Sequence, residues 1–250
     1  VALLNITDGV PGIAVSNLTE QSTGCLHDYT LTTLDLKKLS HADILFINGA
    51  GMEPFMDKIE ENMTNLCIVD TSKGITLLKD NPHIWMSLKN YIQQIDTITA
   101  SLCELSPDYR DAFQKNAAAY EQKLHGLETK IQTGLAPFSG SKMVTFHEAF
   151  DYFAEEFTLE VVATIQHDEH SAPTPNDMKN TITLMKKDEI HALFAEPGNA
   201  DSAIKSIADA TGAVVYTLDP VTAPRDGLDD RDAYITAMEK NLETLEKAFS

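Results

Sequence analysis

The sequence has few cysteines, few aromatic residues and few positive charges. It contains three cysteines and one tryptophan among 250 residues, and aromatic residues make up 7% of the chain. Lysine and arginine number 19 against 38 acidic residues, a net charge of -19, which is the opposite of the balance usual in nucleic-acid-binding proteins. No apolar run approaches the ~20 residues that a membrane-spanning helix needs. With 43% hydrophobic residues, the composition also excludes a disordered chain.

The three cysteines do not form a metal-binding motif, because none lies in a CxxC or another zinc-finger spacing. Cys67 lies in the apolar run "LCIVD" and is expected to be a small buried residue. Cys25 and Cys103 flank less regular segments. They could form a disulfide in an oxidising compartment or stay as two free thiols, and the sequence leaves both alternatives open.

Hydrophobic patterning predicts that helices and strands alternate in the first hundred residues. Residues 1–10 have the pattern of a helix end, and Thr32 or Thr33 can serve as the N-cap of a later helix. The expected strands are "IAVSNL", "DILFING" and "LCIVDTS", and the expected helices between them are "LTTLDLKKLSHA" and "FMDKIEENM". This alternation is typical of a parallel sheet covered by helices.

A long helix and a second alternating region follow. Ser106 and Pro107 form a helix start, and no breaker occurs before Gly126. The expected strands after it are "KMVTF", "LEVVATI", "IHALFAE" and "AVVYTLD", each followed by a loop or a helix. We therefore predict an α/β fold of two similar lobes with parallel sheets joined by one long rigid helix: lobe 1–105, linking helix 106–134 and lobe 135–250.

Three histidines and one aspartate stand where a predicted strand or loop ends. They are His27, His83, His147 and Asp219. Ligands of parallel α/β sheets bind at the carboxyl ends of the strands, and three imidazoles with one carboxylate suit a divalent transition metal, zinc above all. Each residue alone has an ordinary alternative, since such a histidine is more often a cap or surface group and an Asp-Pro after a strand is usually a turn.

The sequence also bears on an enzymatic alternative. It has no GxSxG elbow, P-loop or Rossmann GxGxxG motif, and "NGAGMEP" lacks the glycine spacing of the last. A zinc hydrolase with three protein ligands and a water remains an alternative, but a fourth protein ligand would close the open position that hydrolysis needs.

At these same residues the chain resembles a known family, the metal-binding solute receptors of ABC importers for zinc and manganese. The matching stretches are "CLHDYTLTTLDLKKLSHADILFINGAGMEPFMDK", "NPHIWMSL", "TFHEAFDYFAEEF", "FAEPGNADSAIKSIADATGAVVYTLDP" and "YITAMEKNLETLEKAF". The resemblance implies that His27, His83, His147 and Asp219 bind the ion. A histidine at the third position is typical of zinc-type members, whereas manganese-type members usually carry glutamate there, so Zn²⁺ is favoured and Mn²⁺ stays possible.

The sequence departs from the family pattern at several places. The usual "DPHxW" is "NPHIW", so Asn81 replaces a carboxylate beside His83. The short loop "QHDEHSAPTP" replaces a longer His-rich loop, and we expect its His167, Asp168, Glu169 and His170 either to collect metal or to be only a solvated loop. Glu196 is expected to support the ligands without binding the ion. The abrupt start "VALLNITDGV" is interpreted as a trimmed mature form without the family's first strand and lipid-bearing cysteine.

The resemblance implies an extracytoplasmic receptor rather than an enzyme. Such a protein would be periplasmic or anchored at the cell surface by an N-terminal lipid, and it would pass Zn²⁺ from a cleft between its lobes to a membrane permease. The expected partners are the metal ion and that permease, with no nucleic acid, and the expected state is a monomer. A manganese receptor or a metal-binding adhesin of the same fold is the alternative.

Overall fold

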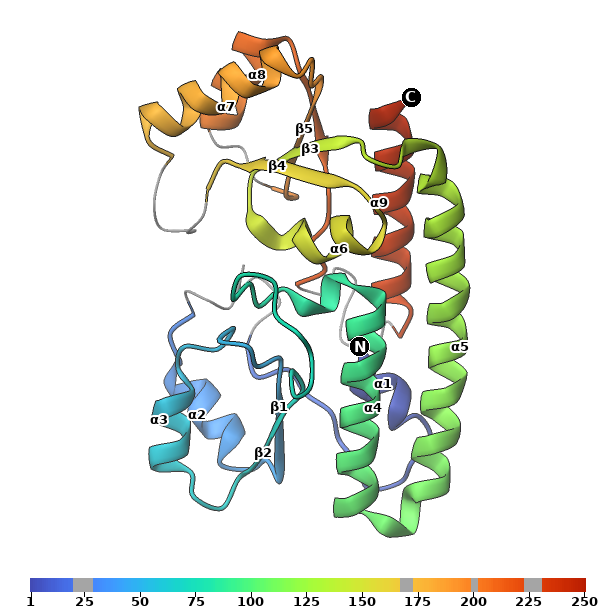
Figure 1. Cartoon of the computed structure of the whole chain (residues 1–250). Coiled ribbons are helices and arrows are strands. Elements are labelled where there is room, and N and C mark those ends of the chain that lie inside the picture. The colour runs from blue at the N-terminus through green and yellow to red at the C-terminus, as the bar shows by residue number, and fades with distance from the viewer. Residues whose placement is uncertain (20–28, 167–172, 199–201, 223–230) are drawn as a thin grey trace. The chain divides into compact units, whose positions relative to one another are not determined.

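The computed structural model describes residues 1–19, 29–166, 173–198, 202–222 and 231–250 (Figure 1). The chain divides into two compact units. Unit 1 comprises residues 1–126 and 222–234, and unit 2 comprises residues 127–221 and 235–250. None of the helices in the described ranges has both the length and the apolar composition that a bilayer crossing requires.

Unit 1 contains a two-stranded parallel sheet covered by short helices. Strand β1 (Ile44–Ile47) pairs with β2 (Cys67–Asp70) in the register Ile44 to Cys67 through Ile47 to Asp70. Helices α1 (Ala2–Ile6), α2 (Thr33–Leu39) and α3 (Met56–Asn62) complete this part. Leu39, Phe55 and Ile59 form an apolar cluster against which Leu45 and Ile68 of the two strands pack, so the sheet is fixed by side chains on these helices.

One expected strand of unit 1 is not formed. Residues 13–18, "IAVSNL", have no strand conformation, and in the described part of the chain β1 pairs only with β2. Apolar composition alone does not make a strand, because a strand needs a neighbour that accepts and donates its ladder hydrogen bonds.

The helical middle of the chain agrees with the predicted long helix. Ser87 caps α4 (Leu88–Leu105) by accepting a hydrogen bond from Asn90 N, and a 3-10 turn, η3 (Pro107–Tyr109), leads into α5 (Arg110–Leu135). Helix α5 continues through Gly126, and the boundary between the two units falls at that residue.

Unit 2 is a four-stranded parallel sheet in the order β4-β3-β5-β6. The strands are β3 (Lys142–Thr145), β4 (Glu160–Thr164), β5 (Ala192–Ala195) and β6 (Val214–Thr217), and the helices are α6 (Asp151–Glu156), α7 (Pro175–Lys187), α8 (Ser202–Thr211) and α9 (Ala233–Phe249). Val144 and Leu193 pack with residues of α7 and α8 on one face, whereas Phe194 meets Phe249 of α9 on the other (Figure 1). This alternation is the period of two expected for strands covered on both faces.

Candidate metal site

In unit 1, His83 is completely buried at the start of the 3-10 turn η2 (Ile84–Met86). The side-chain oxygen of Asn81 accepts the backbone N–H of His83 at 2.9 Å and lies 2.8 Å from its Nδ1. A backbone N–H can only donate, so the Asn81 atom facing it is the amide oxygen, and the Nδ1 contact requires a proton on Nδ1. The hydrogen bonds therefore select the tautomer with the lone pair on Nε2, the form in which Nε2 can bind a metal.

Two further residues fix the backbone around His83. Asn48, directly after β1, donates from Nδ2 to the carbonyl of Pro82 at 2.9 Å, and its Oδ1 accepts from Gln94 Nε2 at 3.1 Å. The hydroxyl of Tyr234 donates to the carbonyl of Trp85 at 2.7 Å. The carbonyls on both sides of His83 are thus held by side chains far away in the sequence.

The turn after β1 is built around Glu53. Its two carboxylate oxygens accept the backbone N–H groups of Asn48 at 2.8 Å and Gly49 at 3.1 Å. Burial raises the pKa of Glu53 to about 7, with the charge of Asp70 adding to the rise and the two N–H donors opposing it. Glu53 therefore connects the conformation of this turn to pH in the neutral range.

Unit 2 brings three of the singled-out residues to one edge of its sheet. His147 follows β3, Glu196 follows β5 and Asp219 follows β6 within two residues of each strand end. Because the strands are parallel and β5 lies between β3 and β6, all three residues follow the same carboxyl edge, with Glu196 on the middle strand. The prediction of strand-end positions is confirmed for His147 and Asp219. It is less exact for His83, which follows β2 only after a connection of 12 residues (71–82).

The ladder hydrogen bonds extend past the strand ends to the residues just before His147 and Asp219. Phe146 N donates to Phe194 O and Gln166 N donates to Phe146 O, each at 2.8 Å, and these bonds fix the residue before His147. His147 itself is 6% exposed, so it has been taken out of bulk water.

Asp219 is fixed by a reciprocal pair of hydrogen bonds with Asn241 of α9. Its N–H donates to Asn241 Oδ1 at 2.7 Å, and its carbonyl accepts from Asn241 Nδ2 at 2.8 Å. Asp219 Oδ1 accepts the N–H of Val221 at 2.9 Å, which turns the chain after Pro220. A half-buried carboxylate held in this way can offer its oxygens to a cation without first reorganising its backbone.

The remaining candidate residues are not tested by the described structure. His27 and Cys25 lie in 20–28, and His167, Asp168, Glu169 and His170 lie in 167–172; both ranges are outside the described residues. Within the described ranges, no three His, Cys, Asp or Glu side chains form a group that could hold a metal ion. Cys103 Sγ donates to the carbonyl of Arg110 at 3.9 Å. The four-residue ligand set and the Cys25–Cys103 pair stay predictions.

Comparison with known proteins identifies the family. The family model described as "ZnuA: Zinc-uptake complex component A periplasmic" matches residues 5–248. The chain belongs to the ZnuA family. It is 28% identical over 236 residues to the manganese-binding lipoprotein MntA of Halalkalibacterium halodurans, covering 90% of this chain and 77% of that one. It is 25% identical over 242 residues to the metal ABC transporter substrate-binding lipoprotein ScbA of Streptococcus cristatus, covering 90% and 78%.

A solved structure places the fold in the same family. The crystal structure of ZnuA superimposes with a TM-score of 0.87 at 27% identity, covering 100% of this chain and 94% of that chain. The predicted α/β class with parallel sheets and a long helix is thereby confirmed, as is the resemblance read from the motifs. Named relatives include both zinc-uptake and manganese-binding proteins, so family membership does not fix the ion.

Sequence reasoning missed the residues that hold the candidate ligands. Asn48, Gln94, Tyr234 and Asn241 were not singled out, although Asn241 carries a signal. It is a buried polar residue on the apolar face of α9 that also carries Met238, Leu242 and Leu245. A buried amide among apolar residues requires hydrogen-bond partners, so its position indicates a structural role.

Proposed function

We propose that this protein is the extracytoplasmic substrate-binding component of a metal ABC importer, which captures Zn²⁺ and delivers it to the membrane permease. His27, His83, His147 and Asp219 bind the ion, His27 and His83 from the N-terminal lobe (1–105) and the other two from the C-terminal lobe (135–250), with 106–134 as the linking helix. The protein works outside the cytoplasm, in the periplasm or attached to the cell surface by a lipid, as the description of the family model and the lipoprotein relatives suggest.

The observation that carries the proposal is the state of His83. A fully buried imidazole whose Nδ1 proton is held by Asn81 has its Nε2 lone pair fixed in direction, and this is the arrangement usual for metal-binding histidines. His147 and Asp219 support it from unit 2, because both follow strand ends at the edge where parallel sheets bind ligands.

Zinc is favoured by the donor set. Three neutral imidazoles are borderline-soft donors suited to tetrahedral Zn²⁺, and one carboxylate adds negative charge, whereas Mn²⁺ favours oxygen donors and more ligands. Four protein ligands also complete a tetrahedral site, so the proposed ion has no open position for a reactive water and the protein captures zinc rather than using it for hydrolysis.

Elemental analysis of the purified protein, with competitive zinc and manganese titrations, tests the proposal. We expect one zinc per chain, tighter binding of zinc than of manganese, and a loss of about 100-fold or more in zinc affinity for both His83→Ala and His147→Ala. His41→Ala is the control, because His41 is exposed just after α2 and its ring forms hydrogen bonds with Lys37 O and Ser40 Oγ at the end of that helix. A wild-type protein without a transition metal, or His83 and His147 variants that bind like His41→Ala, would contradict the proposal.

A further inference from the structure

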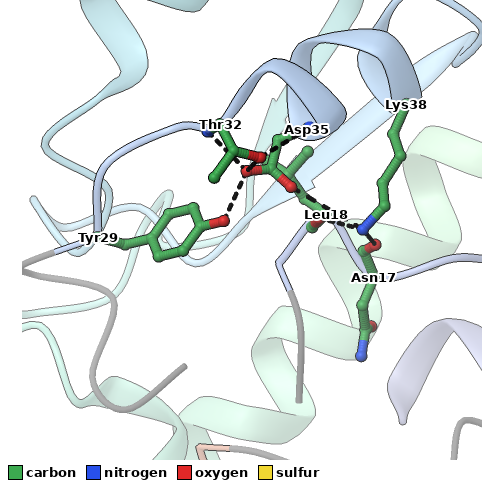
Figure 2. Close-up of polar contacts among 6 residues, drawn as sticks. All are labelled: Asn17, Leu18, Tyr29, Thr32, Asp35 and Lys38. Atoms are coloured by element: carbon green, nitrogen blue, oxygen red, sulfur yellow. Dashed lines mark hydrogen bonds and ion pairs between the residues drawn. The ribbon is translucent and has the colours of Figure 1, made fainter. Parts of the chain in front are cut away.

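A buried carboxylate in unit 1, Asp35, belongs to a group of polar contacts that reaches Tyr29 directly and Leu18 through Lys38. Asp35 is 2% exposed, and its Oδ2 accepts three hydrogen bonds: from the Tyr29 hydroxyl at 2.5 Å, from Thr32 N at 2.9 Å and from Thr32 Oγ1 at 2.8 Å. Its Oδ1 lies 3.9 Å from Lys38 Nζ. Figure 2 shows these side chains converging on the first turn of α2.

The lysine of this group reaches the other end of the segment. Lys38 Nζ donates to the carbonyl of Leu18 at 2.7 Å and to that of Asn17 at 3.4 Å (Figure 2). A continuous series of polar contacts therefore runs from Leu18 through Lys38 and Asp35 to Tyr29. We call Leu18, Tyr29, Thr32, Asp35 and Lys38 the Asp35 clamp.

Apolar packing fixes the same two positions. The side chains of Leu18 and Tyr29 both pack against the cluster of Leu39, Phe55 and Ile59, and the Tyr29 ring meets Phe55 edge-on at 5.9 Å. Leu18 and Tyr29 are thus held by polar and by apolar contacts to the same helices. The residues between them in the sequence include His27, which precedes Tyr29 by two positions.

A second capping box in the chain shows what a helix cap alone requires. In α7, Thr174 and Asp177 make the same reciprocal bonds: Asp177 Oδ2 accepts from Thr174 N at 3.2 Å and from Thr174 Oγ1 at 2.6 Å, and Thr174 Oγ1 accepts from Asp177 N. Asp177 is exposed, and its carboxylate forms capping hydrogen bonds with Thr174. Asp35 therefore differs from an ordinary cap in three ways. It is buried, it accepts a hydrogen bond from the Tyr29 hydroxyl, and it lies close to Lys38.

Burying the Asp35 carboxylate costs free energy, and the exposed cap residue Asp177 does not have this cost. Burial by itself raises the pKa of Asp35, but the hydrogen bonds from Tyr29 and Thr32 and the charge of Lys38 outweigh it and lower the pKa below its ordinary value. The carboxylate is therefore ionised and accepts from Tyr29 in a charge-assisted hydrogen bond, the stronger kind. Fixing both ends of a segment reduces the conformations that its residues must give up when they bind a ligand.

We propose that the Asp35 clamp positions His27 for metal binding, with Tyr29 and Asp35 as positioning residues that do not touch the ion. The inference rests on the proposed function, because it takes His27 as a ligand. His27 precedes Tyr29 by two positions in the sequence, so we expect loss of the Tyr29 contacts to weaken zinc binding through His27, because misplaced ligands bind more weakly.

Zinc titration of Tyr29→Phe, Asp35→Asn and the control Asp177→Asn in the full chain tests the proposal. We expect zinc affinity to fall about tenfold in Tyr29→Phe, which removes one hydroxyl and leaves the capping box intact, and further in Asp35→Asn. Asp177→Asn should bind zinc like the wild type, although it alters the same kind of cap. Equal zinc affinity of wild type and Tyr29→Phe would overturn the proposal.

A double-mutant comparison separates positioning from a general loss of structure. If Tyr29 acts through His27, adding Tyr29→Phe to His27→Ala lowers zinc affinity no further, whereas an independent tenfold loss in that background would contradict the mechanism. Hydrogen exchange of the metal-free protein gives a readout that needs no zinc. Peptides covering residues 19–28 should exchange faster in Tyr29→Phe than in wild type or Asp177→Asn. Unchanged exchange would contradict the proposal that the Asp35 clamp holds the ends of this range.

The same data distinguish failure of the two proposals. A wild-type protein that binds no zinc removes the proposed function and the positioning role together. A wild-type protein that binds zinc, with Tyr29→Phe binding equally well, removes only the clamp.

Discussion

The two units hold their candidate ligands in different ways. In unit 2, His147 and Asp219 come two residues after strands of a four-stranded sheet, and ladder hydrogen bonds extend to Phe146 and Leu218 just before them. The Asn241 side chain adds a reciprocal pair of hydrogen bonds to the backbone of Asp219. In unit 1, the sheet has two described strands, and His83 lies in a connection fixed by the side chains of Asn48, Asn81 and Tyr234.

This difference predicts different sensitivities to substitution. A position defined by backbone ladders and a buried core, such as that of His147, tolerates the loss of one polar side chain, but it depends on the packing of the sheet. A position defined by a few side-chain hydrogen bonds changes when one of those side chains is removed.

Damage to the core of unit 2 should have the largest effect. Leu193 is completely buried on β5, within the apolar cluster under α7 and α8. Leu193→Ala should lower the free energy of unfolding by about 2–5 kcal/mol, measured by urea denaturation, because it leaves a cavity beneath β5, the strand that precedes Glu196. Leu105→Ala, at a side chain 47% exposed, should change it by less than about 0.5 kcal/mol. Equal effects would mean that this sheet is not what stabilises unit 2.

Removal of the Asn48 side chain should lower the stability of unit 1 by more than the loss of a single hydrogen bond would. Asn48→Ala takes away the donor to Pro82 O and the acceptor for Gln94 Nε2, and we expect a loss of about 1–3 kcal/mol with weaker zinc binding. Asn62→Ala is the matched control, because exposed Asn62 also donates to one backbone carbonyl, that of Lys58. If zinc affinity in Asn48→Ala equals that in Asn62→Ala, side-chain hydrogen bonds do not set the position of His83.

Glu53 should make the stability of unit 1 depend on pH. Its pKa rises from 4.5 to about 7 on folding, so between these values the folded state retains a proton that the unfolded state has lost. Stability should therefore fall as pH increases from about 5 to about 7, on the order of 1–2 kcal/mol in total, and stay lower above that. Urea denaturation of Glu53→Gln across this range should show a smaller slope, whereas exposed Glu60→Gln should keep the wild-type slope. An identical slope in Glu53→Gln would contradict the assignment.

The smallest effect is expected for Tyr234. Tyr234→Phe removes the hydrogen bond to Trp85 O and keeps the ring stacked on Tyr91, with centroids 4.0 Å apart. We expect a loss of about 1 kcal/mol and faster exchange of the amides of residues 83–87. Tyr109→Phe, which deletes the same hydroxyl from a ring packed on Phe113, is the control, and equal exchange in both variants would argue against a role for the Trp85 carbonyl contact.

Local signals explain which elements could be predicted from the sequence. Thr32, one of the two residues predicted as the N-cap, caps α2, and this could be predicted because the capping box is contained within four residues. The strand-end positions of His147 and Asp219 could be predicted because β3 and β6 are short apolar runs in the sequence, although most of β6 is exposed in the structure. Residues 13–18 do not form the predicted strand, because a strand needs a pairing partner and the local sequence does not encode one.

The support of His83 could not be predicted for the same reason. Asn48 and Pro82 are separated by 34 residues, and Trp85 and Tyr234 by 149. Whether two such side chains meet is decided by the packing of the whole unit. The motif "NPHIW" therefore indicated a histidine worth attention, but not the tautomer or the burial that make it suited to a metal.

Gly49 sets how closely the turn after β1 can approach the end of β2. A Cβ atom at this position would lie 1.8 Å from Asp70 Oδ1, an oxygen already held by Ser72 N and Ser72 Oγ. Any side chain at residue 49 would therefore meet this carboxylate, and the backbone φ of +78° also favours glycine there. The missing side chain is what lets the turn after β1 approach the carboxyl end of β2 so closely.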